Sequence, residues 1–282
     1  GLYKLSACLL CFLKKKISKF TEPILFRYYT SCLKRLILVL NNLNKYKASK
    51  LSRSTMKPLI TLGTAIIPNS GGELTLLRRE DEFSIRLSGT RGELMNSRIY
   101  NSEQELSKLG CAHIKNKDNS AVLVGGLGMG YTLATALECV NKKSQVTVAE
   151  LIPEVIEWNQ GPLGECAGKP LTDDHCHVRL GDIAELIKKQ QPNFDAILLD
   201  VDNGPDGITK TDNDWLYSCS GLDALYKSLR ADGMLAVWSA HPDELFTKRL
   251  KKTRFSVTVR TVRARPGKGS RHTIFLAKKP SR

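Results

Sequence analysis

The chain has 282 residues, of which 41% are hydrophobic and 25% are charged. A chain of this length and hydrophobic content can bury a substantial core, which excludes a disordered protein. Most of the formal net charge of +15 lies in residues 1–55, which hold twelve Lys or Arg residues against Glu22 alone. The remaining chain has an ordinary balance, so charge alone does not indicate a nucleic acid or membrane partner.

Residues 1–55 are interpreted as a basic N-terminal extension, either non-native or disordered. The composition changes abruptly at Met56, where a globular pattern begins, so Met56 is the expected natural start. A surface-binding or targeting arm is the alternative, since basic amphipathic stretches bind anionic lipid. No run reaches the ~18 apolar residues that a membrane span needs. Among eight cysteines only Cys8 and Cys11 show paired spacing, which indicates a reduced, cytoplasmic compartment.

Residues 56–100 are expected to form a small antiparallel β-hairpin module. Short β-type segments cover 59–67, 73–77 and 83–87, and turn residues separate the first two. A helix should begin after Ser102, whose hydroxyl can cap it, with Glu105 completing a capping box.

Residues 101–282 alternate between apolar strands and amphipathic helices. Strands are expected over 121–124, 145–149, 176–180, 194–199, 234–239, 255–262 and 272–277, and helices over 131–140, 153–158, 183–189, 214–229 and 243–250. Strands separated by helices require right-handed crossovers. This predicts an α/β fold with a doubly wound, mainly parallel seven-stranded sheet, a Rossmann-like catalytic domain that binds a donor. The last two strands lack an intervening helix, so the final strand should be antiparallel.

A glycine-rich loop follows the first strand of this domain. Gly125, Gly126, Gly128 and Gly130 lack side chains, so the backbone can approach a ligand closely. Tyr131 stands where a dinucleotide fingerprint needs its last glycine, which disfavours NAD or FAD. No Gly-Lys-Ser/Thr follows either, so the loop does not match a nucleoside triphosphate site.

Two carboxylates follow the next two strands, at the edge where a doubly wound sheet binds ligands. Glu150 ends one strand, twenty residues past Gly130, where a carboxylate can accept both ribose hydroxyls of a nucleoside. Asp182 follows a glycine hinge and can accept an adenine amino group. A helix cap is the alternative for Asp182. The expected donor-binding residues are Gly125, Gly126, Gly128, Gly130, Glu150, Leu151, Asp182 and Ile183.

The fourth strand ends in two further acids, Asp200 and Asp202, ahead of a Gly/Pro loop. Two carboxylates at this position could hold a nucleophile that is cationic or that loses a proton. The alternative is that these acids only help to form the turn. The expected catalytic residues are Asp200 and Asp202, and the expected acceptor-binding residues are Asn203 and Tyr217. A core role for Tyr217 is the alternative to substrate contact.

Together these blocks resemble the spermidine synthase (aminopropyltransferase) family, in its bacterial branch with a class I methyltransferase fold. The blocks are GGLGMG, VTVAELIPEVIEWN, RLGDI and FDAILLDVDNGPDG, preceded by a β-hairpin module and Ser102-Glu103, and the resemblance spans about 61–278. It implies that decarboxylated S-adenosylmethionine is the donor, with Glu150 on its ribose and Asp182 on its adenine. It implies further that Asp200 orients and deprotonates the attacking amine.

Two positions depart from the family pattern. The family's loop carries an Asp that holds the aminopropyl nitrogen of the donor, and the matching residue is Gly128. The family's second acid after the fourth strand is Asn203 in this chain, with Asp202 one position earlier. Both departures remove negative charge from the amine-binding region. An S-adenosylmethionine-dependent methyltransferase is therefore the runner-up, followed by a non-catalytic nucleoside- or RNA-binding module.

The expected partner is a small-molecule amine or another nucleophilic acceptor, and a homodimer is left open. No metal is expected, because His175 and His177 share one face of a strand and lack further ligand pairs. The basic run over 248–265, together with Lys268 and Arg271, favours a solvated face over an RNA site, because few aromatic residues interleave with it.

Overall fold

The computed structural model describes residues 57–68, 72–90, 92–189, 191, 193–201 and 214–281. The chain divides into two units, residues 1–58 and residues 59–282. The predicted N-terminal extension over 1–55, the expected start at Met56, and the predicted site residues Asp202 and Asn203 lie outside the described residues. The fold below is that of the second unit. No helix in its described part is both long and apolar enough to cross a membrane.

The second unit begins with a four-stranded antiparallel sheet in the order β1-β2-β3-β4. Its strands are β1 (Ile60–Ile67), β2 (Gly72–Arg79), β3 (Glu82–Leu87) and β4 (Met95–Asn96). The first three match the β-type segments predicted over 59–67, 73–77 and 83–87. In β2 and β3, Leu74, Leu76, Phe83 and Ile85 are buried. One face of this sheet therefore packs on the remainder of the unit.

The second sheet has seven strands in the order β10-β11-β9-β8-β5-β6-β7. Its strands are β5 (Ala121–Gly125), β6 (Gln145–Glu150), β7 (Cys176–Leu180), β8 (Phe194–Leu199), β9 (Leu229–Ser239), β10 (Ser256–Arg265) and β11 (Lys268–Lys278). Strands β5 to β9 pair in parallel, whereas β11 runs antiparallel to both β9 and β10. The predicted doubly wound, mainly parallel sheet and its antiparallel final strand are thus confirmed.

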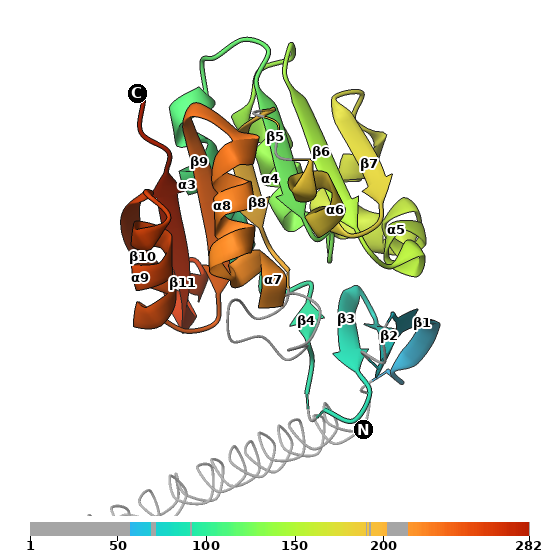
Figure 1. Cartoon of the computed structure of the whole chain (residues 1–282). Coiled ribbons are helices and arrows are strands. Elements are labelled where there is room, and N and C mark those ends of the chain that lie inside the picture. The colour runs from blue at the N-terminus through green and yellow to red at the C-terminus, as the bar shows by residue number, and fades with distance from the viewer. Residues whose placement is uncertain are drawn as a thin grey trace, which may run out of the picture. The chain divides into compact units, whose positions relative to one another are not determined.

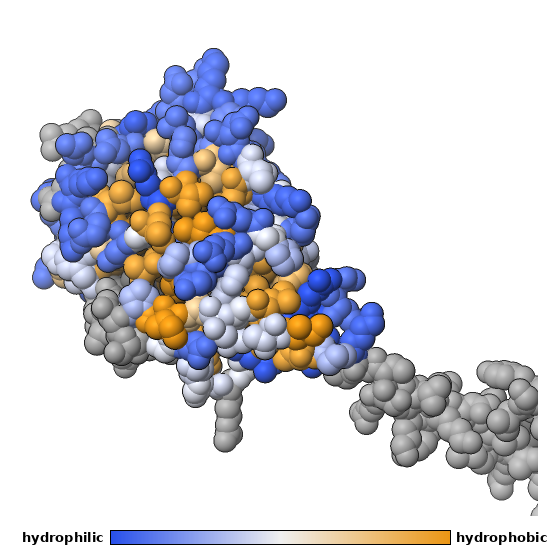
Figure 2. Space-filling model, turned by 90° about the vertical axis from the view of Figure 1, so that its right-hand side faces the viewer, coloured by the Kyte–Doolittle hydropathy of each residue, from blue (hydrophilic) through white to orange (hydrophobic). Residues whose placement is uncertain are grey.

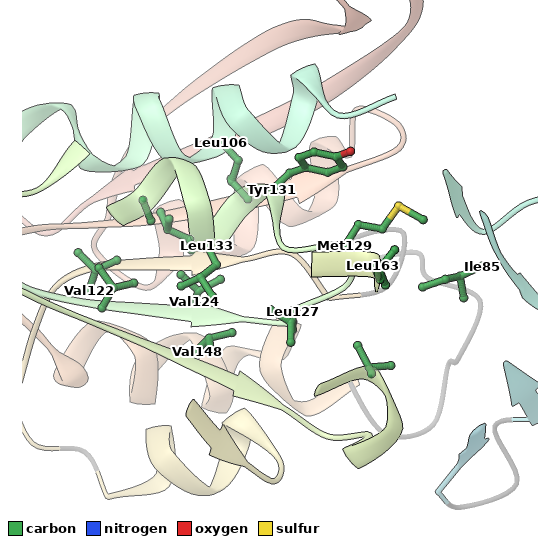
Figure 3. Packing of buried hydrophobic residues seen from close by; sticks show 14 of the residues in the cluster. Ile85, Leu106, Val122, Val124, Leu127, Met129, Tyr131, Leu133, Val148 and Leu163 are labelled. Atoms are coloured by element: carbon green, nitrogen blue, oxygen red, sulfur yellow. The ribbon is translucent and has the colours of Figure 1, made fainter. Parts of the chain in front are cut away.

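Helices cover both faces of this sheet (Figure 1). On one face lie α3 (Asn101–Cys111), α4 (Tyr131–Cys139) and α5 (Pro153–Gln160), and on the other lie α6 (Ile183–Lys188), α8 (Cys219–Ser228) and α9 (Glu244–Lys252). The first face also packs against the small sheet: Ile85 of β3 belongs to the same buried cluster as Leu106, Leu133 and Leu163 (Figure 3). One continuous core therefore fixes the small sheet beside the glycine loop.

Two local predictions about helices were wrong. The helix expected over 214–229 is two helices, α7 (Asp214–Tyr217) and α8, because the Ser218 hydroxyl accepts a hydrogen bond from the Gly221 amide and caps a new helix. The expected capping box at Ser102 and Glu105 is absent. Helix α3 already includes Ser102, whose hydroxyl donates to Glu103 Oε2 at 2.9 Å, while Glu105 pairs with Lys108.

The end of the sheet at β7 is unusually open. Along this edge strand every residue after Cys176 is exposed, including Val178 at 38% and Leu180 at 61%. Hydrophobic residues gather on this side of the molecule (Figure 2). Leu151, just after β6, is also 40% exposed. Apolar surface is therefore accessible beside the strand ends that carry the predicted donor-binding residues.

Candidate active site

Backbone hydrogen bonds join the carboxyl ends of four neighbouring strands. The Asp200 amide donates to the Gly125 carbonyl at 2.9 Å, and the Gly126 amide donates to the Ala149 carbonyl at 2.9 Å. The Gly181 amide donates to the Glu150 carbonyl at 2.8 Å. The loops after β8, β5, β6 and β7 thus lie side by side in that order. The structure brings the predicted donor-binding residues to one edge of the sheet.

The glycine loop makes a close approach to β8. Gly126, Gly128 and Gly130 have φ values of 86°, 52° and 83°, a left-handed region that favours glycine. A Cβ on Gly126 would lie 2.5 Å from the Asp200 carbonyl oxygen, and one on Gly128 would lie 3.3 Å from Met95 Sδ. The loop therefore needs glycine at Gly126 for space as well as for backbone conformation.

Glu150 holds the two loops on either side of it. The Leu127 amide donates to its Oε2 at 2.8 Å, and the Ile152 amide donates to its Oε1 at 2.9 Å. The side chain is buried, and burial raises the pKa of its carboxyl although these amides act in the opposite direction. The Leu151 and Gly128 amides add to this opposing effect, so backbone N–H groups surround the carboxylate.

Asp182 lies at the end of β7 with an exposed side chain. Its Oδ1 accepts a hydrogen bond from the Ala184 amide at 2.8 Å and caps α6, as the alternative reading of the sequence required. Ile183, the next residue, is buried at 5% exposure. Asp182 is thus a helix cap at the same edge of the sheet as the glycine loop.

Asp200 forms the centre of a carboxylate pair. Thr132 Oγ1 donates to its Oδ2 at 2.5 Å, and the side chain interacts electrostatically with Glu103 at the start of α3. Burial raises the pKa of Asp200 to about 6, and burial together with the Asp200 charge raises the pKa of Glu103 to about 7. Two half-buried like charges disfavour joint ionisation, so around neutral pH the pair can take up a proton.

Sequence reasoning did not identify Glu103, Thr132 or Asn159 as site residues. Asn159 Nδ2 donates to the Gly128 carbonyl at 2.8 Å and to the Val155 carbonyl, and so supports the glycine loop from α5. Ser107 ties α3 to α4 by donating to the Thr132 carbonyl at 2.7 Å. A polar residue near the start of a helix is a weak signal, and these roles depend on packing between segments far apart in sequence.

Tyr217 lies in the core. It is 3% exposed, its ring packs edge-on against Phe246 at 5.7 Å, and its hydroxyl donates to the Val201 carbonyl at 3.3 Å. Its hydroxyl therefore approaches the chain just after Asp200 from the face opposite α3. Tyr217 can therefore stabilise the chain at the end of β8.

A cavity of about 370 Å³ lies beside α4. Its lining is Asp81, Ser97, Tyr100, Gln104, Tyr131, Ala134, Thr135, Glu138, Cys166 and Ala167. The rings of Tyr100 and Tyr131 stack in it at 4.8 Å, and the Tyr131 hydroxyl donates to the Ser97 carbonyl. None of the predicted donor-binding residues lines this cavity. Within the described part of the chain, no three His, Cys, Asp or Glu side chains come together as a metal site.

Comparisons with known proteins agree with the geometry. A family model described as the spermine/spermidine synthase domain matches residues 103–258, more than half of the chain. Among curated proteins none matches. A spermidine synthase solved in complex with the transition-state analogue AdoDATO is 17% identical, with a TM-score of 0.62 over 79% of this chain and 73% of its own. The spermidine synthase of Thermotoga maritima gives the same identity and TM-score over 79% of this chain and 74% of its own.

The structural likenesses show that the fold is shared, and the family model supplies the assignment. The resemblance inferred from the sequence blocks is confirmed, and with it the prediction that the protein is an aminopropyltransferase-type transferase. The chain belongs to the spermine/spermidine synthase domain family.

Proposed function

We propose that the protein transfers an aminopropyl group from decarboxylated S-adenosylmethionine to an amine, with Asp200 and Glu103 receiving the proton. The observation that carries this proposal is the carboxylate pair at the end of β8, beside the glycine loop and within the family domain. An anionic pair next to a donor-binding loop is suited to hold an ammonium and to take its proton.

The donor is proposed to lie across the ends of β5, β6 and β7. Glycine at position 126 allows the backbone to approach it, Glu150 receives its ribose hydroxyls, and Asp182 receives its adenine amino group. Leu151 directly follows Glu150, and Leu180 lies two residues before Asp182. Their exposed side chains supply apolar contact for the adenine ring. The accessible apolar surface beside these two carboxylates supports the roles proposed for Glu150 and Asp182.

The reaction is an in-line displacement at the methylene carbon next to the sulfonium. The nitrogen lone pair of the acceptor forms the new N–C bond while the C–S bond breaks, and its electron pair returns to sulfur, which leaves as a neutral thioether. The surplus proton on nitrogen passes to the Asp200 and Glu103 pair. Because the leaving group is already activated, alignment and deprotonation are the tasks left to the protein.

Glu103→Gln is expected to alter the pH dependence of turnover. In the unaltered protein kcat/KM should rise with pH across the region of the two pKa values, about 6 and about 7, because the pair must be deprotonated to accept a proton. Removing one carboxylate removes the like-charge repulsion, so the rise should become a single step at lower pH. Steady-state profiles from pH 5 to 9 with one acceptor would measure this.

Glu105→Gln is the matched control, because Glu105 lies on the same helix but pairs with exposed Lys108. Its profile should match that of the unaltered protein. A Glu103→Gln profile that also matched would remove Glu103 from the proton-accepting role.

Calorimetry with both forms of the donor tests the reaction class. The decarboxylated donor is expected to bind at least about tenfold more tightly than S-adenosylmethionine, because the carboxylate of the latter would approach the Asp200 and Glu103 charges. Tighter binding of intact S-adenosylmethionine, followed by methyl transfer, would instead establish the methyltransferase alternative, which the uncharged Gly128 position favours. Binding of neither donor would end both enzyme assignments.

A further inference from the structure

The C-terminal part of the protein is uniformly basic. Residues 245–282 hold thirteen Lys or Arg residues and no Asp or Glu. They form α9 and the hairpin of β10 and β11, at the opposite end of the sheet from β7. Such a charge distribution creates a positive field over one end of the site-bearing edge.

Like charges face each other at the turn of this hairpin. Arg263 pairs across the strands with Arg271, and Arg265 pairs with Lys268. Cations placed directly opposite each other destabilise a hairpin. Among the described residues no carboxylate forms an ion pair with these four side chains, which we call the cationic tip. Binding of an anion from outside the chain would reduce this repulsion.

The cationic tip lies on the same edge of the sheet as Asp200. Strand β9 runs parallel to β8, and Thr273 of β11 pairs with Ser239 at the carboxyl end of β9, so the turn projects beyond that end (Figure 1). Asn101 Nδ2 donates to the Arg263 carbonyl at 2.7 Å, which fastens the tip to the start of α3. That same helix turn carries Glu103.

Two nitrogen atoms without partners lie between the carboxylate pair and the cationic tip. Trp238 on β9 and His272 on β11 pack edge-on at 4.8 Å on the face that α3 covers. Trp238 Nε1 and His272 Nδ1 are buried and have no hydrogen-bond partner in the described part of the chain. An indole N–H only donates, and burial lowers the pKa of His272, which keeps that ring neutral. A hydrogen-bond acceptor, not an ammonium, complements the Trp238 N–H.

We propose that the acceptor is an amine that also carries an anionic group, with its amine at Asp200 and Glu103 and its anionic end directed toward Trp238, His272 and the cationic tip. Two strand spacings separate β8 from β11, so the two ends of the acceptor lie about 10 Å apart. The proposal rests on the proposed aminopropyl transfer. A linear diamine would direct its second ammonium toward the cations, and is disfavoured for that reason.

A pair of acceptors of equal length tests this proposal in the full chain. With decarboxylated S-adenosylmethionine as donor, 8-aminooctanoate is expected to give a kcat/KM about tenfold or more above that of 1,8-diaminooctane. The two molecules share one reactive amine and differ in the charge at the far end. A preference for the diamine would overturn this inference alone. Absence of turnover with both these acceptors and putrescine would instead count against aminopropyl transfer itself.

Charge reversal at the tip gives a second test. The double variant R263E/R271E is expected to lose the preference for 8-aminooctanoate and to move toward the diamine, with the turnover of both still measurable. The control K115A/K142A removes two exposed cations on the opposite edge of the sheet and should retain the preference. An R263E/R271E variant that folds, by circular dichroism, and keeps the preference would contradict the proposal.

Salt and competitors separate a small anionic acceptor from a polyanion. Inorganic phosphate is expected to inhibit turnover of 8-aminooctanoate competitively in the unaltered protein and several-fold less in R263E/R271E. A ten-nucleotide single-stranded RNA that inhibits far more strongly than phosphate, with a steep salt dependence, would assign the tip to a nucleic acid and overturn the small-acceptor proposal.

Discussion

Asp200→Asn is expected to lower kcat by roughly 10²–10⁴-fold, the range that a positioned general base contributes. Asn can still accept the hydrogen bond from Thr132 Oγ1, so the end of β8 should keep its position. It cannot take the proton from the attacking nitrogen. Rapid-quench measurement of a single turnover, together with calorimetric measurement of the donor Kd, would separate chemistry from binding.

Asp182→Asn is the control for this variant, because Asp182 is an acid on the same edge of the sheet with a different proposed role. Asn also caps helices well, so α6 should persist. This variant should weaken donor binding while leaving the single-turnover rate largely unchanged. If Asp200→Asn instead raised the donor Kd and kept the rate, Asp200 would be a binding residue and the proton would need another acceptor.

Gly126→Ala is expected to reduce kcat/KM by about 10²-fold or more. A methyl group at this position would lie 2.5 Å from the Asp200 carbonyl oxygen, closer than real Cβ contacts, so either the loop or the β8 end must shift. Displacements of about 1 Å in a catalytic arrangement can lower rates by about 10²-fold. The variant should therefore impair both donor binding and the position of the base Asp200, so both kcat and KM should change.

Gly168→Ala isolates the steric part of this effect. Gly168 also has a left-handed backbone, with φ of 75°, but no atom lies within 4 Å of a Cβ built there. Both variants carry the conformational strain, about 1–2 kcal/mol for a left-handed residue, and only Gly126→Ala carries the clash. Thermal unfolding would compare their stabilities. Equal kcat/KM values in the two variants would show that close approach at Gly126 is not needed.

The sequence predicted the large sheet well because the signals are local. Each parallel strand is an apolar run, such as 194–199, and turn residues or helix starts separate it from the next. The positions of Gly126, Glu150 and Asp182 at neighbouring strand ends followed from connectivity alone, because a doubly wound sheet places the carboxyl ends of its parallel strands on one edge.

Features built from distant segments could not be predicted in this way. Glu103 comes near Asp200 only when α3 packs across β8. No local sequence pattern around either residue indicates this interaction. The Trp238 and His272 pair likewise forms because β11 inserts beside β9, a pairing that depends on the antiparallel return of the chain. At Ser218 the error had a local cause. The apolar periodicity predicted one helix over 214–229, but the Ser218 cap starts a new helix within that range.

Glu150 uses both carboxylate oxygens on backbone amides of the protein itself, those of Leu127 and Ile152. The segments that would enclose a nucleoside are consequently fixed when the chain folds, and their loss of conformational entropy belongs to folding. A ligand arriving there meets a preorganised surface. Its measured affinity should therefore reflect the new contacts directly, with little reduction from the ordering of mobile segments.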